Sequence, residues 1–135
     1  MFDSVLRVSA EEFDVNSFLE RYTLAVHFEA YSKGENDILG NTNSESGFDA
    51  LISENENLDE HLVEVDAFLR ANEALLLELK SEAIISILDL GFTVESNGEL
   101  SPSIRLPAEL LGTLHRLDVS VEISAYPSEN QNNLS

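Results

Sequence analysis

The sequence contains no cysteine and no tryptophan, and only 7 of its 135 residues are lysine or arginine. The absence of cysteine excludes disulfide bonds, thiolate nucleophiles and cysteine-ligated metal sites. The apolar runs are too short to span a bilayer, and the first residues lack the basic and apolar segments of a secretory signal. We therefore expect a cytoplasmic protein that does not enter a membrane.

Acidic residues, by contrast, are in large excess. The chain carries 26 aspartates and glutamates and a formal net charge of −19. From Gly34 to Leu69 there are ten carboxylates and no lysine or arginine. This charge disfavours nucleic acid and anionic membranes as partners and favours a cationic one. Because 43% of the residues are apolar, we expect one folded domain over residues 1–127, followed by a disordered polar tail over 128–135.

Alternating or continuous apolar runs predict five strands. They cover residues 2–9, 24–31, 48–52, 83–92 and 119–126. In addition, the pair Asn97-Gly98 is typical of a tight hairpin, and it predicts a further short strand over 101–105.

Apolar residues at helical spacing predict three helical segments. The first follows Asp14, which can cap it, and Pro107 suits the first position of the third. The second follows Asn57 and covers residues 58–80, either as one helix or as two with a kink near 70–72. Residues 32–47 are rich in turn formers and predict a long polar loop, of the kind that is either mobile or used for binding.

The order of these elements predicts an α+β fold. We expect a ferredoxin-like split βαβ core with an additional C-terminal helix and strand, a mostly antiparallel sheet, and helices on one face. The exposed face of this sheet would carry Arg7, His27, Glu29, Tyr31, Glu122 and Tyr126.

Four short motifs occur in a recognisable order. They are Lys33-Gly34-Glu35, Ser46-Gly47-Phe48, Leu58-Asp59-Glu60-His61-Leu62 and Leu106-Pro107-Ala108-Glu109-Leu110-Leu111. Through this combination, the chain resembles, over about residues 2–126, a bacterial domain-of-unknown-function family (number 4279) of small uncharacterised α+β domains. The resemblance implies a fold class and a bacterial origin, and no activity. Some similar small acidic bacterial domains serve as immunity proteins against toxins, which is an analogy of class.

No residue pattern predicts catalysis. His27 and Glu29 lie two residues apart on one predicted strand, but a metal site needs a further ligand. The loop glycines do not form a phosphate-binding motif, and the EF-hand spacing is absent. His61, among carboxylates at the start of the long helix, is predicted to be a surface residue with a slightly raised pKa. We expect no enzymatic activity, no metal and no cofactor.

The charge leads to a protein-binding hypothesis. An acidic surface built from residues 34–69 would dock a cationic partner, such as a nuclease toxin, with electrostatic steering of the encounter. The candidate binding residues are Glu35, Asp37, Glu45, Asp49, Glu54, Glu56, Asp59 and Glu60.

Three other interpretations stay open. The acidity can serve solubility alone. A small ligand-binding or enzymatic domain would use a site on the sheet face formed by His27, Glu29, Tyr31 and Tyr126. A structural domain would form a homodimer through an exposed strand edge.

Overall fold

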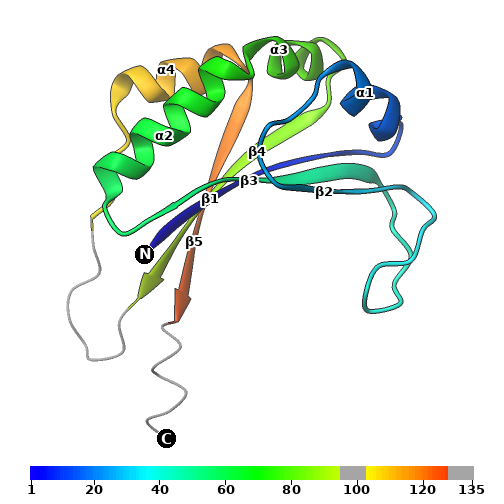
Figure 1. The fold of residues 1–135 in the computed structure, drawn as a ribbon, viewed down its shortest axis with the longest axis horizontal. Helices are drawn as coiled ribbons and strands as arrows, with labels where there is room; N and C mark the ends of the chain where they lie inside the picture. The colour runs from blue at the N-terminus through cyan, green and yellow to red at the C-terminus, as the bar shows by residue number, and fades with distance from the viewer. Residues whose placement is uncertain (95–102, 128–135) are drawn as a thin grey trace, which may run out of the picture.

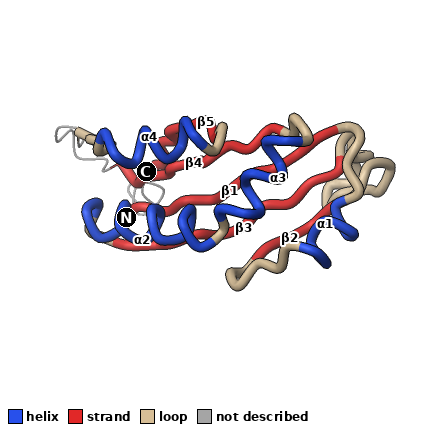
Figure 2. The backbone as a smooth tube through the Cα atoms, turned by 90° about the horizontal axis from the view of Figure 1, so that it is seen from above, coloured by secondary structure: helices blue, strands red, loops and turns tan. Residues whose placement is uncertain are grey.

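The computed structural model of the chain describes residues 1–94 and 103–127. The described strands form one sheet and are β1 (Phe2–Ala10), β2 (Phe28–Tyr31), β3 (Ser46–Asn55), β4 (Ile85–Val94) and β5 (Val119–Pro127). The described helices are α1 (Val15–Arg21), α2 (Leu58–Ala71), α3 (Glu73–Ser81) and α4 (Ala108–Arg116). Figure 1 shows the helices on one face of the sheet, and Figure 2 shows them from above.

The strands are arranged in the order β2-β3-β1-β4-β5. The pairs β2–β3, β3–β1 and β1–β4 are antiparallel, whereas β4 and β5 are parallel. The first four strands therefore have the ferredoxin-like order, and α4 is the crossover that adds β5 beside β4. This confirms the predicted fold class, including the split βαβ core and the C-terminal helix and strand.

The hydrophobic core fills the space between the sheet and the helices. Alternate residues of each strand enter it, such as Leu6 and Val8 of β1, which are fully buried. From the helix layer, Phe18 of α1 stacks on Phe48 of β3 with ring centroids 6.4 Å apart. Further fully or nearly fully buried residues of the core are Val65, Leu69, Leu76, Leu79, Leu88, Leu114 and Leu117.

Local capping signals are confirmed. The Asp14 side chain accepts a hydrogen bond from the backbone of Ser17 (3.2 Å), and Asn57 accepts one from Glu60 (3.0 Å). The long helical segment is two helices, because Asn72 ends α2 by donating its side-chain amide to the Phe68 carbonyl (2.9 Å). The new helix α3 starts at Glu73.

The predicted bounds of three strands are wrong, and one of these, β4, begins and ends two residues later than the predicted 83–92. β2 begins at Phe28, and residues 24–27 lie outside it, although Leu24 and Val26 pack against the core. The alternation of apolar residues here arises because every second side chain is buried, and it does not mean that the segment pairs with a neighbouring strand. β3 is longer than predicted, since it runs from Ser46 to Asn55 and includes a bulge.

The end of β5 also differs from the prediction. Ile123 continues the alternation that begins at the buried Val119, yet it is 51% exposed. In Figure 1, β4 and β5 extend past the helices, so none of the described helices covers the far half of β5. The predicted hairpin at Asn97-Gly98 and the polar tail over 128–135 lie outside the described residues, and 103–107 contain no strand.

His61 is buried, which corrects the prediction of a surface residue. Its Nε2 lies 2.6 Å from Ser4 Oγ, and its Nδ1 lies 2.8 Å from Asn55 Oδ1. Because the Asn55 oxygen can only accept, Nδ1 carries the proton and Nε2 accepts from the Ser4 hydroxyl. Burial lowers the pKa of His61, although the Glu64 and Asp3 carboxylates act in the opposite direction. The imidazole is therefore a neutral bridge between α2 and the sheet.

Replacing His61 by phenylalanine removes both hydrogen bonds and leaves the buried Ser4 hydroxyl unpaired. We expect the free energy of unfolding to fall by about 1–3 kcal/mol at neutral pH. The difference between the two proteins shrinks below pH 6.5, because the unfolded wild-type histidine takes up a proton there before the folded one, whose pKa is lowered. Urea unfolding across acidic and neutral pH measures both effects.

His27 supplies the control, since its side chain is 74% exposed. The His27→Phe variant should show no comparable loss of stability at neutral pH. A stability difference for His61→Phe that does not change with pH would contradict the neutral buried bridge.

Candidate functional site

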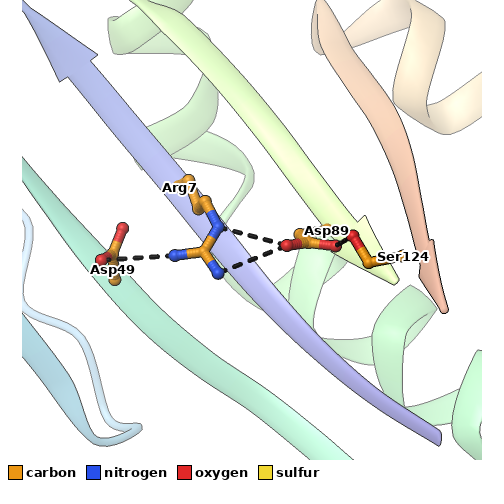
Figure 3. A network of polar contacts seen from close by, with 4 residues as sticks. All are labelled: Arg7, Asp49, Asp89 and Ser124. Carbon is orange, nitrogen blue, oxygen red and sulfur yellow. Dashed lines mark hydrogen bonds and ion pairs between the residues drawn. The ribbon is translucent and has the colours of Figure 1, made fainter. Parts of the chain in front are cut away.

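Arg7 occupies the centre of the sheet face that the helices leave open. Its Nη1 lies 3.4 Å from Asp49 of β3, and its Nε and Nη2 each lie 3.3 Å from Asp89 Oδ2 of β4. The hydroxyl of Ser124 on β5 donates to the other oxygen of Asp89 (2.8 Å). Figure 3 shows this network, which links β3, β1, β4 and β5 through side chains alone.

The strand register explains this meeting of charges. Arg7 stands opposite Asp49, and Asp89 stands opposite Val5, two residues along β1 on the same face. The Asp89 side chain is only 9% exposed, and Arg7 and Ser124 supply the polar contacts that its buried carboxyl group needs. Burial lowers the pKa of Arg7, but the two carboxylates raise it more. Sequence reasoning missed Asp89, although a lone carboxylate within an apolar strand was a usable signal.

A second feature of the open face is a hollow of about 600 Å³ beside β2 and β3, closed on one side by the loop between them. We call it the acidic hollow. Its lining residues are Glu29, Ala30, Tyr31, Glu35, Asn36, Asp37, Ile38, Asn43 and Asp49. Four of these are carboxylates, and no lysine, arginine or histidine is among them.

The loop that closes the acidic hollow is held by its own hydrogen bonds. Gly34 donates to the Asn43 carbonyl (2.9 Å), and Asn43 donates back to Glu35 (2.8 Å). The Asp37 side chain accepts from the backbone of Leu39 (2.9 Å), which forms a tight turn. Gly34 has a φ of +89°, a conformation that other residues avoid. The predicted loop is thus confirmed, and it has a defined shape.

Tyr31 lies between the acidic hollow and the sheet. Its hydroxyl passes over Gly47, where a Cβ atom would lie 2.7 Å from it. Burial raises the pKa of Tyr31, and the Asp49 and Glu45 carboxylates raise it further, while a hydrogen bond with Ser9 lowers it. The phenol therefore stays neutral and gives the hollow a flat, partly apolar wall.

In the structure, each of the two predicted sets of binding residues is only partly found at the acidic hollow. The acidic hollow unites three charge-based candidates with two from the sheet-face alternative, namely Glu35, Asp37 and Asp49 with Glu29 and Tyr31. Glu45 lies just before β3 and acts on Tyr31 electrostatically. The other charge-based candidates lie at the far end of β3 and the start of α2 and are Glu54, Glu56, Asp59 and Glu60.

The remaining sheet-face candidates lie apart from the hollow. His27 is exposed, and its Nε2 is 3.9 Å from Glu29 but outside the lining. Tyr126 is on β5 at the opposite edge of the sheet, where it lies over Gly91. The two exposed apolar residues of the loop tip, Ile38 and Leu39, were not among the predicted site residues.

Within residues 1–94 and 103–127, no three histidine, aspartate or glutamate side chains are grouped so as to hold a metal ion. None of the helices described there is long and apolar enough to cross a membrane. Comparison with protein-family models, curated proteins and solved structures finds no match for this chain. The family resemblance therefore stays a prediction.

The Arg7→Met variant tests the central network. It keeps much of the side-chain length but leaves the buried Asp89 carboxylate with only Ser124 as a partner. We expect a loss of about 1–3 kcal/mol in the free energy of unfolding, measured with urea at neutral pH. Arg70→Met is the matched control, because Arg70 is 66% exposed and its helical pair with Asp66 is worth at most about 0.5 kcal/mol. Equal losses in the two variants would refute a central role for Arg7.

The pKa of Tyr31 reports the charge of the hollow. We expect it to lie above 10.0 in the wild type and to move back toward 10.0 in Asp49→Asn, which removes one of the charges that raise it. NMR titration of ring-labelled tyrosine, assigned with a Tyr31→Phe variant, measures the shift. Glu54→Gln, at the far end of β3, should leave the titration of Tyr31 unchanged.

Proposed function

We propose that this chain is a non-enzymatic protein-binding module whose acidic hollow receives a cationic segment of a partner protein. One observation carries the proposal: Glu29, Glu35, Asp37 and Asp49 converge on one hollow that no basic side chain lines. A lysine or arginine entering it would meet several carboxylates at once. Attraction between such charges is stronger in a concave site than on a flat surface, because less water screens it.

The charges of the hollow are largely uncompensated. Asp49 shares Arg7 with Asp89, and the exposed His27 lies 3.9 Å from Glu29, but no lysine or arginine of the described ranges forms an ion pair with Glu29, Glu35 or Asp37. Asp37 instead accepts backbone hydrogen bonds within the loop, and so does Glu35 from Ser32 (3.0 Å). These bonds fix the carboxylates in place without cancelling their charge, so the site is organised before a partner arrives.

The tip of the loop adds an apolar contact. The side chain of Ile38 is fully exposed and lines the hollow, and Leu39 beside it is 82% exposed. The backbone of a hydrogen-bonded turn loses little freedom on binding, and apolar anchors next to charged groups are typical of protein interfaces. The partner segment would therefore combine a cationic side chain with an apolar neighbour.

An immunity-like role is a specific form of this proposal. A toxin that acts on nucleic acid has a cationic active site, and an acidic module would reach it quickly through electrostatic steering. The charge of the whole chain and the charge of the hollow both support a cationic target.

The proposal is tested with a labelled decalysine peptide and fluorescence anisotropy at low salt. The hollow variant carries Glu29→Gln, Glu35→Gln, Asp37→Asn and Asp49→Asn, and amides keep the acceptor oxygens that hold the loop. The control variant carries Glu54→Gln, Glu56→Gln, Asp59→Asn and Glu60→Gln, with the same change in net charge. We expect the Kd to rise about tenfold or more in the hollow variant and less than about threefold in the control.

Binding of the wild type should weaken steeply as salt is added, because screening removes the attraction. Circular dichroism and thermal unfolding check that both variants fold. Equal weakening in the two variants would mean that the peptide responds to overall charge, and it would overturn the hollow as the binding site.

A further inference from the structure

β5 is an edge strand of the sheet that the described residues form. It has nine residues and pairs with β4 in a parallel ladder, and no strand of the described part of the chain pairs with its other side. The outward backbone N–H and C=O groups of such an edge can pair with another strand. The opposite edge is different, since β2 has only four residues and leads directly into the hydrogen-bonded loop.

β5 also lacks the features that protect edge strands from pairing. It contains no lysine or arginine, its register with β4 shows no bulge, and its one proline is the last residue, Pro127. Glu122 is its only charged residue. Two large side chains are exposed, Ile123 at 51% and Tyr126 at 45%. This is the edge at which a second strand would add most easily.

The sequence of β5 is complementary to itself in antiparallel pairing. Ile123 is its central residue, so a two-fold axis through Ile123 places Glu122 opposite Ser124. The same axis places Val121 opposite Ala125 on the side that faces the helix layer. No like charges stand directly opposite each other, and apolar side chains meet apolar side chains.

We propose that the outer edge of β5 is a homodimer interface, in which two copies pair antiparallel about Ile123 to form one continuous sheet. A second copy fits this edge better than a basic segment does, because β5 offers such a segment a single carboxylate, Glu122. The position of this interface also keeps the most acidic parts of the two copies away from each other. The acidic hollow borders β2 and β3 at the other side of the sheet, so the two hollows of the dimer lie far apart.

Salt distinguishes this association from the binding of a cationic partner. Each copy carries a net charge of −19, and the repulsion between copies weakens as salt is added. We expect dimer formation to strengthen with salt, whereas binding at the acidic hollow weakens. The dimer does not depend on the proposed function, and either proposal can fail without the other.

Sedimentation equilibrium of the wild type at low and high salt measures the dimer. The fraction of dimer should rise with protein concentration and with salt. Ile123→Glu places two carboxylates opposite each other and should raise the dimer Kd by about tenfold or more. Val63→Glu is the control, because Val63 is 69% exposed on α2 and gains the same charge away from β5, and its Kd should stay within about threefold of the wild type.

A cysteine at the axis provides a second, independent measurement. The chain has no cysteine of its own, so Ile123→Cys introduces the only thiol. Directly opposed residues of antiparallel strands are close enough for a disulfide, and oxidation should cross-link this variant much faster than Val63→Cys. A wild type that is monomeric at every salt and protein concentration, with equal cross-linking of the two cysteine variants, would overturn the proposal. So would a dimer that Ile123→Glu leaves intact.

Discussion

The ion pairs of Arg7 with Asp49 and Asp89 hold the centre of a sheet face that no helix covers. The chain has 26 acidic residues and 7 basic ones, so most carboxylates have no basic partner. The few cations therefore decide where an acidic side chain can be buried. Arg7 and Ser124 together permit a nearly buried Asp89 in an otherwise apolar stretch of β4. Carboxylates without such partners lie on the surface of the helices, as Glu60 and Glu64 do, and on the loops.

The fold could be predicted because its signals are local. Asp14 and Asn57 cap helices through bonds to residues three positions away, and alternation along each strand reflects the single covered face. His61 could not be placed in the same way. The preceding Asp59 and Glu60 are acidic and exposed, but the turn of the helix points His61 inward toward Ser4, which is 57 residues away. The partner that makes its burial possible is too distant in sequence to be recognised from the local pattern.

The acidic character of the candidate site could be predicted from the sequence, but the set of carboxylates that form it could not. The acidic stretch of residues 34–69 is continuous in sequence, yet β3 runs through its middle as an extended strand of ten residues. Such a strand is about 30 Å long, so it separates the carboxylates that precede it, such as Asp37, from those that follow it, such as Glu56 and Asp59. Conversely, Glu29 and Asp49 are distant in sequence but directly opposite in the register of β2 and β3. Strand pairing, which the sequence does not reveal, decides which charges share a site.

The same pairing separates two kinds of surface on one sheet. At the β2 edge, four carboxylates surround a hollow and a shaped loop presents exposed Ile38 and Leu39. At the β5 edge, one carboxylate accompanies a half-exposed Ile123 and an open row of backbone groups. Coulomb attraction dominates at the first edge, while backbone hydrogen bonds and apolar contact dominate at the second. The net negative charge favours a cationic partner at the β2 edge, whereas at the β5 edge it opposes self-association. Ions in solution screen both of these charge effects but leave backbone hydrogen bonds and apolar contacts largely intact.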